Sequence, residues 1–114
     1  MALNSVSYVG RLTRDPEAKY FSSGACKVTF DIAVRRLGRD APPNYFSIEC
    51  WSKTAEVVAN YCRKGSLVGV SGSIKFEGWA DRNSGVPRDK PVIKADKIDL
   101  LGSKSDNQQH EDEF

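Results

Sequence analysis

The sequence predicts an all-β fold in which five strands form one small Greek-key barrel and a single helix lies between the third and fourth strands. Three observations predict it. The chain has 114 residues, which is enough for one domain with a modest core. Four segments carry an apolar side chain at every second residue, the period of a strand with one buried face, and a fifth, at 91–101, does so less regularly. Between the third and fourth of these, the period changes to that of an amphipathic helix.

The first two strands are expected at 5–12 and 26–35. Pro16 breaks the pattern after the first, because proline cannot donate to a strand ladder. A short extended piece at 20–21 and a turn then lead into the second strand, which has the most regular alternation in the chain. Its inward-facing residues are Cys26, Val28, Phe30, Ile32 and Val34.

The third strand is expected at 44–52, after a loop at 37–43. Its inward residues are Phe46, Ile48 and Cys50, and its outward residues are Tyr45, Ser47, Glu49 and Trp51. Two flat aromatic rings on one face of a strand form a surface on which nucleic-acid bases can stack. The alternative is that both faces are covered, as in a central strand or a subunit contact, since strands favour aromatic residues in any case.

The helix is expected at 53–63, with a buried stripe of Ala55, Val58, Ala59 and Cys62. Gly65 is expected to follow its carboxyl end as the C′ residue. The fourth strand is expected at 66–77, where glycines allow a sharp bend. A long polar loop is expected at 80–91, followed by a last strand at 91–101 whose irregular pattern indicates a bulge. This order of elements is the plan of the OB-fold, a barrel that binds oligonucleotides and oligosaccharides.

Charge divides the chain into two parts. The net charge is +2, but residues 103–114 hold four acids and a single lysine, so the preceding part is mildly basic. We therefore expect an OB-fold domain at 1–102 and a short, disordered acidic tail at 103–114. The start of the chain has no basic region followed by an apolar core, which predicts a cytoplasmic protein without an export signal. Three cysteines without metal-ligand spacing predict buried free thiols, and neither a metal site nor a cofactor is expected.

At residues 3–102 the chain resembles the bacterial single-stranded DNA-binding proteins. The matching segments are 9–12, 15–17, 55–57, 61–66, 72–79 and 100–102. The most specific are the Asp15-Pro16-Glu17 turn and, later in the chain, the turn Arg63-Lys64-Gly65-Ser66. The resemblance implies an OB-fold that assembles as a homotetramer and binds single-stranded DNA. It also implies a nucleoid-associated location and recruitment of replication, recombination and repair proteins through the C-terminal tip.

The resemblance also implies the binding residues. Three aromatics fall at base-stacking positions: Tyr45, Trp51 and Trp79. Lysines fall at phosphate-contacting positions, namely Lys53, Lys64 and Lys75, and arginines fall near the loops along the DNA path, namely Arg35, Arg36, Arg82 and Arg88. The partner-binding tip is Glu111, Asp112, Glu113 and Phe114. It lacks the Ile-Pro that often precedes the terminal Phe in the family, which suggests weaker or narrower partner recruitment.

Two departures concern the loop and the subunit contact. Leu37 stands where many members carry a stacking aromatic, and Phe46 stands where several carry a polar His. We expect no enzymatic activity, since the only histidine lies in the acidic tail without a nucleophile partner. Two alternative functions remain: an OB-fold adaptor of the primosomal type that mainly docks replication proteins, and an oligosaccharide-binding module, which would normally be secreted and disulfide-bonded.

Overall fold

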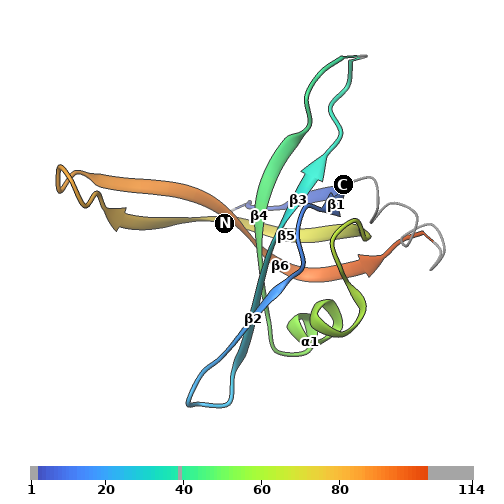
Figure 1. Cartoon of the computed structure of the whole chain (residues 1–114), viewed down its shortest axis with the longest axis horizontal. Helices are drawn as coiled ribbons and strands as arrows, with labels where there is room; N and C mark the ends of the chain where they lie inside the picture. The colour runs from blue at the N-terminus through green and yellow to red at the C-terminus, as the bar shows by residue number, and fades with distance from the viewer. Residues whose placement is uncertain (1–2, 39, 103–114) are drawn as a thin grey trace.

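The computed structural model describes residues 3–38 and 40–102. The elements in these ranges are β1 (Val6–Leu12), β2 (Glu17–Tyr20), β3 (Cys26–Val34), β4 (Asn44–Trp51), α1 (Ser52–Tyr61), β5 (Leu67–Ala80) and β6 (Pro87–Leu100) (Figure 1). The expected acidic tail and its tip residues lie outside the described residues.

The sheet closes on itself. Its order is β1-β5-β6-β4-β3-β2, and β1 also pairs with β3, which completes a circuit of five strands. The closing contact is short, with Arg11 opposite Ala33 and Leu12 opposite Ile32. These five strands are the five predicted ones, and α1 lies between the third and fourth of them, so the all-β OB-fold plan is confirmed. The structure adds a sixth strand: the short extended piece is β2, which pairs with β3.

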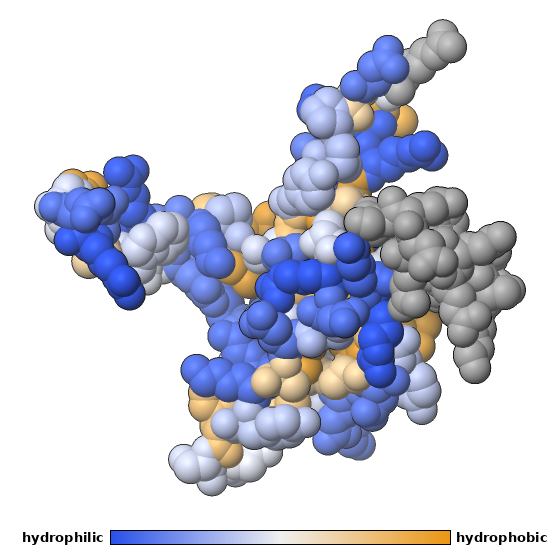
Figure 2. Space-filling view, in the orientation of Figure 1, coloured by the Kyte–Doolittle hydropathy of each residue, from blue (hydrophilic) through white to orange (hydrophobic). Residues whose placement is uncertain are grey.

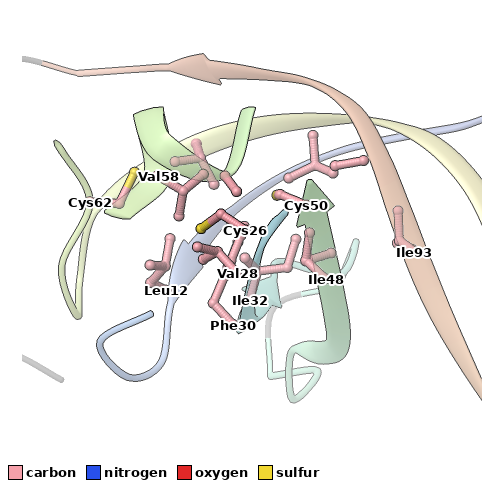
Figure 3. Packing of buried hydrophobic residues seen from close by; sticks show 14 residues of the cluster. Leu12, Cys26, Val28, Phe30, Ile32, Ile48, Cys50, Val58, Cys62 and Ile93 are labelled. Carbon is pink, nitrogen blue, oxygen red and sulfur yellow. The ribbon is translucent and has the colours of Figure 1, made fainter. Parts of the chain in front are cut away.

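The core fills the barrel and lies under α1 (Figure 3). The alternation of β3 places Cys26, Val28, Phe30 and Ile32 inside, as predicted, while Val34 is only partly buried. The helix contributes Ala55 and Val58, and Cys62 follows its last turn. Because these side chains come from β1, β3, β4, α1, β5 and β6, the core fixes the outward faces of the strands as well.

The end of the helix differs from the prediction. Gly65 is not its C′ residue, because the helix ends at Tyr61 and Cys62 is already extended. The Arg63 guanidinium donates to the carbonyls of Ala59 and Cys62 at 3.2 and 2.7 Å. Gly65 instead has a φ of +91° and donates its N–H to the Leu12 carbonyl at 2.8 Å, which ties this turn to β1.

The prediction of a long polar loop at 80–91 is wrong. Strand β5 runs to Ala80, β6 begins at Pro87, and the connection is a turn over residues 81–86. The Asp81 carboxylate accepts the N–H groups of Asn83 and Ser84, and the Asp81 N–H donates to the Val86 carbonyl, so the turn is tightly closed. Residues 75–92 form the β5–β6 arm, which projects from the barrel and is largely hydrophilic (Figures 1 and 2). An arm in solvent needs no buried face, which explains why its sequence lacks alternation.

The expected bulge lies in β6. The pairing with β5 passes from Ser71 opposite Lys97 to Gly72 opposite Ala95, so Asp96 is the extra residue. A Cβ atom at Gly72 would lie 2.0 Å from the Lys94 carbonyl oxygen, which only glycine avoids. The barrel bends where the two strands approach this closely.

Candidate nucleic-acid interface

The outer face of the β3–β4 pair is the surface that carries Tyr45, Ser47, Glu49 and Trp51 on β4 and, opposite them, Ala33, Asp31, Thr29 and Lys27 on β3. A shallow depression in this outer face is lined by residues of four strands. They include Thr29 of β3, Ser47 and Glu49 of β4, Glu77 of β5 and Lys90 of β6. The outer face therefore continues without a break onto the β5–β6 arm.

The three predicted stacking aromatics lie along this surface and not in one pocket. Tyr45 and Trp51 are on the same face of β4, about 20 Å apart, because six residues of strand rise about 3.3 Å each. Trp79 stands on the arm, on the same side of β5 as Lys75 and Glu77. Tyr45 is 66% exposed and Trp79 is 50% exposed, so both rings have area free for a ligand. Such spacing suits an extended polymer better than a compact ligand.

Glu49 corrects the prediction of a solvent-facing carboxylate. Its side chain is 1% exposed, and its oxygens lie 3.1 Å from Lys27 Nζ and 2.6 Å from Lys75 Nζ. The pairing pattern explains the burial, since Glu49 lies on the central strand between β3 and β6. Burial alone would raise the pKa of Glu49, but the ammonium groups of Lys75 and Lys27 outweigh it and hold that pKa below its ordinary value.

Lys75 is therefore less free than the sequence suggests. Besides Glu49, its ammonium lies 3.7 Å from a Glu77 oxygen. The contact with Glu49 raises the pKa of Lys75 above its ordinary value, so this lysine is charged at neutral pH. Two carboxylates, of Glu49 and Glu77, offset that charge locally, so less of it is available to an anionic ligand than the sequence predicts.

Trp51 belongs to a cluster that sequence reasoning missed. The Phe21 ring stacks on it with centroids 5.6 Å apart and planes 23° apart, and Lys27 Nζ lies 5.7 Å from the Trp51 centroid. Lys19 Nζ lies 5.4 Å from the Phe21 centroid. The only signal in the sequence was the alternation of Lys19 and Phe21, which places both on one face of an extended segment.

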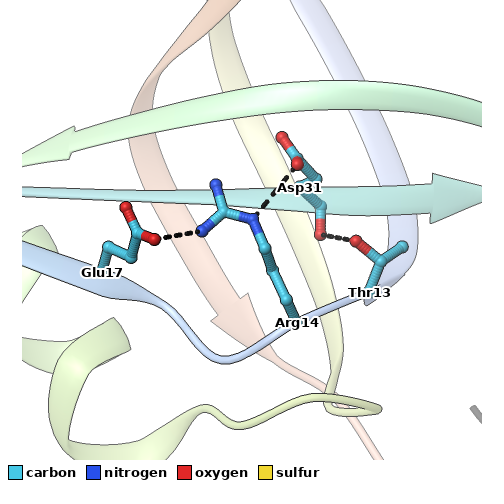
Figure 4. A network of polar contacts seen from close by, with 4 residues as sticks. All are labelled: Thr13, Arg14, Glu17 and Asp31. Atoms are coloured by element: carbon cyan, nitrogen blue, oxygen red, sulfur yellow. Dashed lines mark hydrogen bonds and ion pairs between the residues drawn. The ribbon is translucent and has the colours of Figure 1, made fainter.

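A polar network fixes the segment that leads to this cluster (Figure 4). Arg14 Nε lies 3.3 Å from Asp31 Oδ2, and Arg14 Nη1 lies 3.2 Å from Glu17 Oε1. The Thr13 hydroxyl lies 3.5 Å from the Asp31 carbonyl oxygen. These contacts hold the start of β2 against β3, which sets where Lys19 and Phe21 can lie.

The other lysine and arginine side chains predicted to contact DNA are dispersed over the fold. Arg35 and Arg36 are exposed just after β3, and Lys53 is exposed in the first turn of α1. Lys64 is partly buried in the turn after α1, where its N–H donates to Asp15 Oδ1 at 2.8 Å. At the far end of the β5–β6 arm, Arg82 is exposed and Arg88 Nε lies 3.6 Å from Asp81 Oδ2. The structure thus places these basic side chains in four separate parts of the fold.

The cysteines are free and buried, as predicted. Burial raises the pKa of Cys50 to about 12 and that of Cys62 to about 11, so both remain thiols at neutral pH. Among the described residues, no group of three acidic, histidine or cysteine side chains is placed to hold a metal ion. None of the helical structure at 3–38 and 40–102 is long and apolar enough to cross a membrane.

The closed strand circuit, the helix between β4 and β5 and the aromatic outer face define an OB-fold protein, a class that binds oligonucleotides or oligosaccharides on a sheet face and its loops. The profile of the Single-strand binding protein family matches residues 3–101. The chain belongs to the Single-strand binding protein family. This membership confirms the resemblance and agrees with the prediction of a binding protein and not an enzyme.

Curated relatives extend the match. Single-stranded DNA-binding protein 1 of Synechocystis sp. is 55% identical over 109 residues, which cover 94% of this chain and 90% of that protein. Single-stranded DNA-binding protein 1 of Nostoc sp. is 52% identical over 106 residues, covering 93% and 89%. The single-stranded DNA-binding protein of Borreliella burgdorferi is 41% identical over 115 residues, covering 96% and 77%.

Proposed function

We propose that this chain binds single-stranded DNA without sequence preference, by stacking bases on Tyr45, Trp51 and Trp79 while basic side chains contact phosphates. The observation that carries the proposal is the continuity of the outer face of β3–β4 with the Trp79 side of the β5–β6 arm, through the shared depression and the Glu49–Lys75 contact. Base stacking tolerates any sequence because every base has a flat face. The names of the relatives support the same ligand.

We assign the phosphate contacts first to the basic side chains that are exposed. Arg35, Arg36, Lys53 and Arg82 are open to solvent, whereas the charges of Lys75 and Arg88 are shared with carboxylates. Each phosphate neutralised by a lysine or arginine releases counterions, so the affinity falls as salt rises. In the cell, such a protein would protect exposed DNA strands in the cytoplasm during replication, recombination and repair.

Substitution of the exposed aromatics tests this proposal. Trp79→Ala and Tyr45→Ala should each weaken binding to labelled oligo-dT, measured by fluorescence anisotropy, by about tenfold, given stacking worth about 1–3 kcal/mol per base. Phe76→Ala is the matched control, since Phe76 is 69% exposed but lies on the opposite side of β5 from Trp79. Equal losses for Trp79→Ala and Phe76→Ala, or no loss for either, would refute the stacking face and favour the adaptor alternative.

A homotetramer is also part of the proposal. It rests on the resemblance and on a second depression, away from the outer face, that is lined by residues of β1 and β5, such as Val9 and Ser71. Val9 is 54% exposed and Leu101 lines the same depression, which leaves apolar surface for a second copy. Light scattering coupled to gel filtration would give four times the chain mass if it is correct.

Recruitment of replication and repair proteins is proposed for the tip residues Glu111, Asp112, Glu113 and Phe114. A terminal aromatic residue with its carboxylate can enter an apolar pocket rimmed by bases. Deleting 103–114 should abolish pull-down of a partner helicase or exonuclease and leave the affinity for oligo-dT within about threefold. Partner capture that survives the deletion would refute this role of the tail.

A further inference from the structure

The tip of the β2–β3 hairpin presents an aromatic ring beside the proposed stacking face. Phe21 follows directly after β2, and its turn is closed by two hydrogen bonds, from the Phe21 N–H to the Ala25 carbonyl and from the Gly24 N–H to the Phe21 carbonyl, both 2.9 Å. With the Arg14 network at the other end of β2, the hairpin holds the Phe21 ring against Trp51. A ring fixed in this way loses little freedom when a ligand binds to it.

Two like charges stand next to this ring. Lys19 and Lys27 are directly opposite each other in the β2–β3 register, an arrangement that destabilises a strand pair unless an anion offsets it. Glu49 pairs with Lys27, but among the described residues no carboxylate forms an ion pair with Lys19. Both lysines line a hollow, together with Glu17, Ala18 and Thr29. Two ammonium groups and one carboxylate, that of Glu17, line this hollow, and Glu17 is already paired with Arg14 at 3.2 Å. The hairpin therefore offers an open recess beside an aromatic ring in which positive charge is in excess.

We propose that Phe21 is a further base-stacking residue and that Lys19, with Lys27, contacts the neighbouring phosphate. The single strand then continues past Trp51 along the β2–β3 hairpin. The Lys19 ammonium now lies over the Phe21 ring, and a base displaces it, because stacking of a base is stronger than an exposed cation–π contact. This inference rests on the proposed function, since it extends the same DNA path.

Glu49 has a positioning role in this arrangement. Its buried carboxylate holds Lys27 at 3.1 Å, and Lys27 lies over the Trp51 ring. These contacts fix the position of Lys27 on the outer face, while the Lys19 side chain can move to contact a phosphate. The charge of Lys27 is already offset by Glu49, whereas that of Lys19 is not. We therefore expect replacement of Lys19 to change the salt dependence of DNA binding more strongly than replacement of Lys27.

The experiment measures the affinity of full-length chains for labelled oligo-dT by anisotropy over a series of salt concentrations. Phe21→Leu keeps apolar contact with Trp51 but removes the aromatic face, and it should weaken binding about tenfold. Phe21→Tyr should bind within about twofold of the wild type. Lys19→Gln should reduce the slope of log affinity against log salt by about one.

Tyr20→Leu is the matched control. Tyr20 precedes Phe21 and is 73% exposed, but it pairs with the buried Cys26 and so lies on the opposite side of β2. Its affinity should stay within about twofold of the wild type. If the wild type binds oligo-dT and Phe21→Leu binds it with equal affinity, the stacking role of Phe21 is refuted while the proposed function stands. A wild-type protein that does not bind at all would overturn the proposed function itself.

Discussion

The Lys75 ammonium of β5 lies 2.6 Å from the buried carboxylate of Glu49 on β4. These two residues join the β5–β6 arm to the outer face of the barrel, although β4 and β5 are not adjacent in the sheet order. The contact does two things at once. It offsets the charge of a buried carboxylate, and it ties the base of the β5–β6 arm to β4.

Replacing Glu49 should destabilise the fold. Glu49→Gln removes the common partner of Lys27 and Lys75. We expect a loss of about 1–3 kcal/mol in the free energy of unfolding. This is less than the usual cost of breaking a fully buried ion pair, because both lysines reach solvent. Urea unfolding at neutral pH measures it. Glu77→Gln is the control, with a loss below about 0.5 kcal/mol, since Glu77 is solvent-accessible and its contact with Lys75 is long. Equal losses for the two variants would contradict the central place of Glu49.

The contribution of Glu49 should depend on pH with a definite sign. Because the pKa of Glu49 in the folded chain lies below its ordinary value of 4.5, its stabilising effect is complete above that ordinary value and is lost as pH falls through the folded-state pKa. The difference in unfolding free energy between the wild type and Glu49→Gln should therefore shrink on acidification from pH 5 to pH 3. A difference that grows over this window would mean that burial dominates and the pKa is raised.

Gly72 should tolerate no side chain. Gly72→Ala would bring a Cβ atom within 2.0 Å of the Lys94 carbonyl, so strand β5 or the β6 bulge must move. We expect a loss of about 3 kcal/mol in the free energy of unfolding. Gly69→Ala is the control on the same strand, where the nearest atom would be 3.6 Å away. Equal melting temperatures for the two variants would refute the claim that β5 and β6 approach each other closely at Gly72.

The three cysteines should resist thiol reagents in the folded chain. Burial raises the pKa of Cys50 to about 12, which leaves almost no thiolate at pH 8, and the Cys50 and Cys62 side chains have no exposed surface. Labelling with a coloured disulfide reagent should be slow for the native protein and fast for all three thiols in urea. Rapid labelling of Cys50 in the native state would show that α1 opens readily from the barrel.

The sequence was most informative where one face of an element is buried. The alternation of β3 and the stripe of α1 predicted the core, because burial imposes a period on apolar residues. It failed where that constraint is absent. Beyond its base, the β5–β6 arm is exposed to solvent at residues 78–80 and 82–91, so nothing in the pattern there distinguishes strand from loop.

The candidate site shows the same limit. The alternation at 44–52 pointed to Tyr45 and Trp51, the family resemblance added Trp79, and the structure leaves Tyr45 and Trp79 exposed. Period two assigned Glu49 to the exposed side, but a central strand in a closed barrel is covered where its neighbours place long side chains over it. The Phe21–Trp51 contact could not be predicted, since it depends on a pairing of β2 with β3 that four residues do not specify.

The measurement that tests the central claim most directly is intrinsic tryptophan fluorescence during titration with oligo-dT, with a duplex of equal length as the comparison. Trp51 and Trp79 are the two tryptophans of the chain, so every change in signal reports on the proposed stacking face. We predict strong quenching by the single strand that weakens as salt is added, and little response to the duplex. Absence of quenching, or an equal response to both ligands, would contradict binding through these rings.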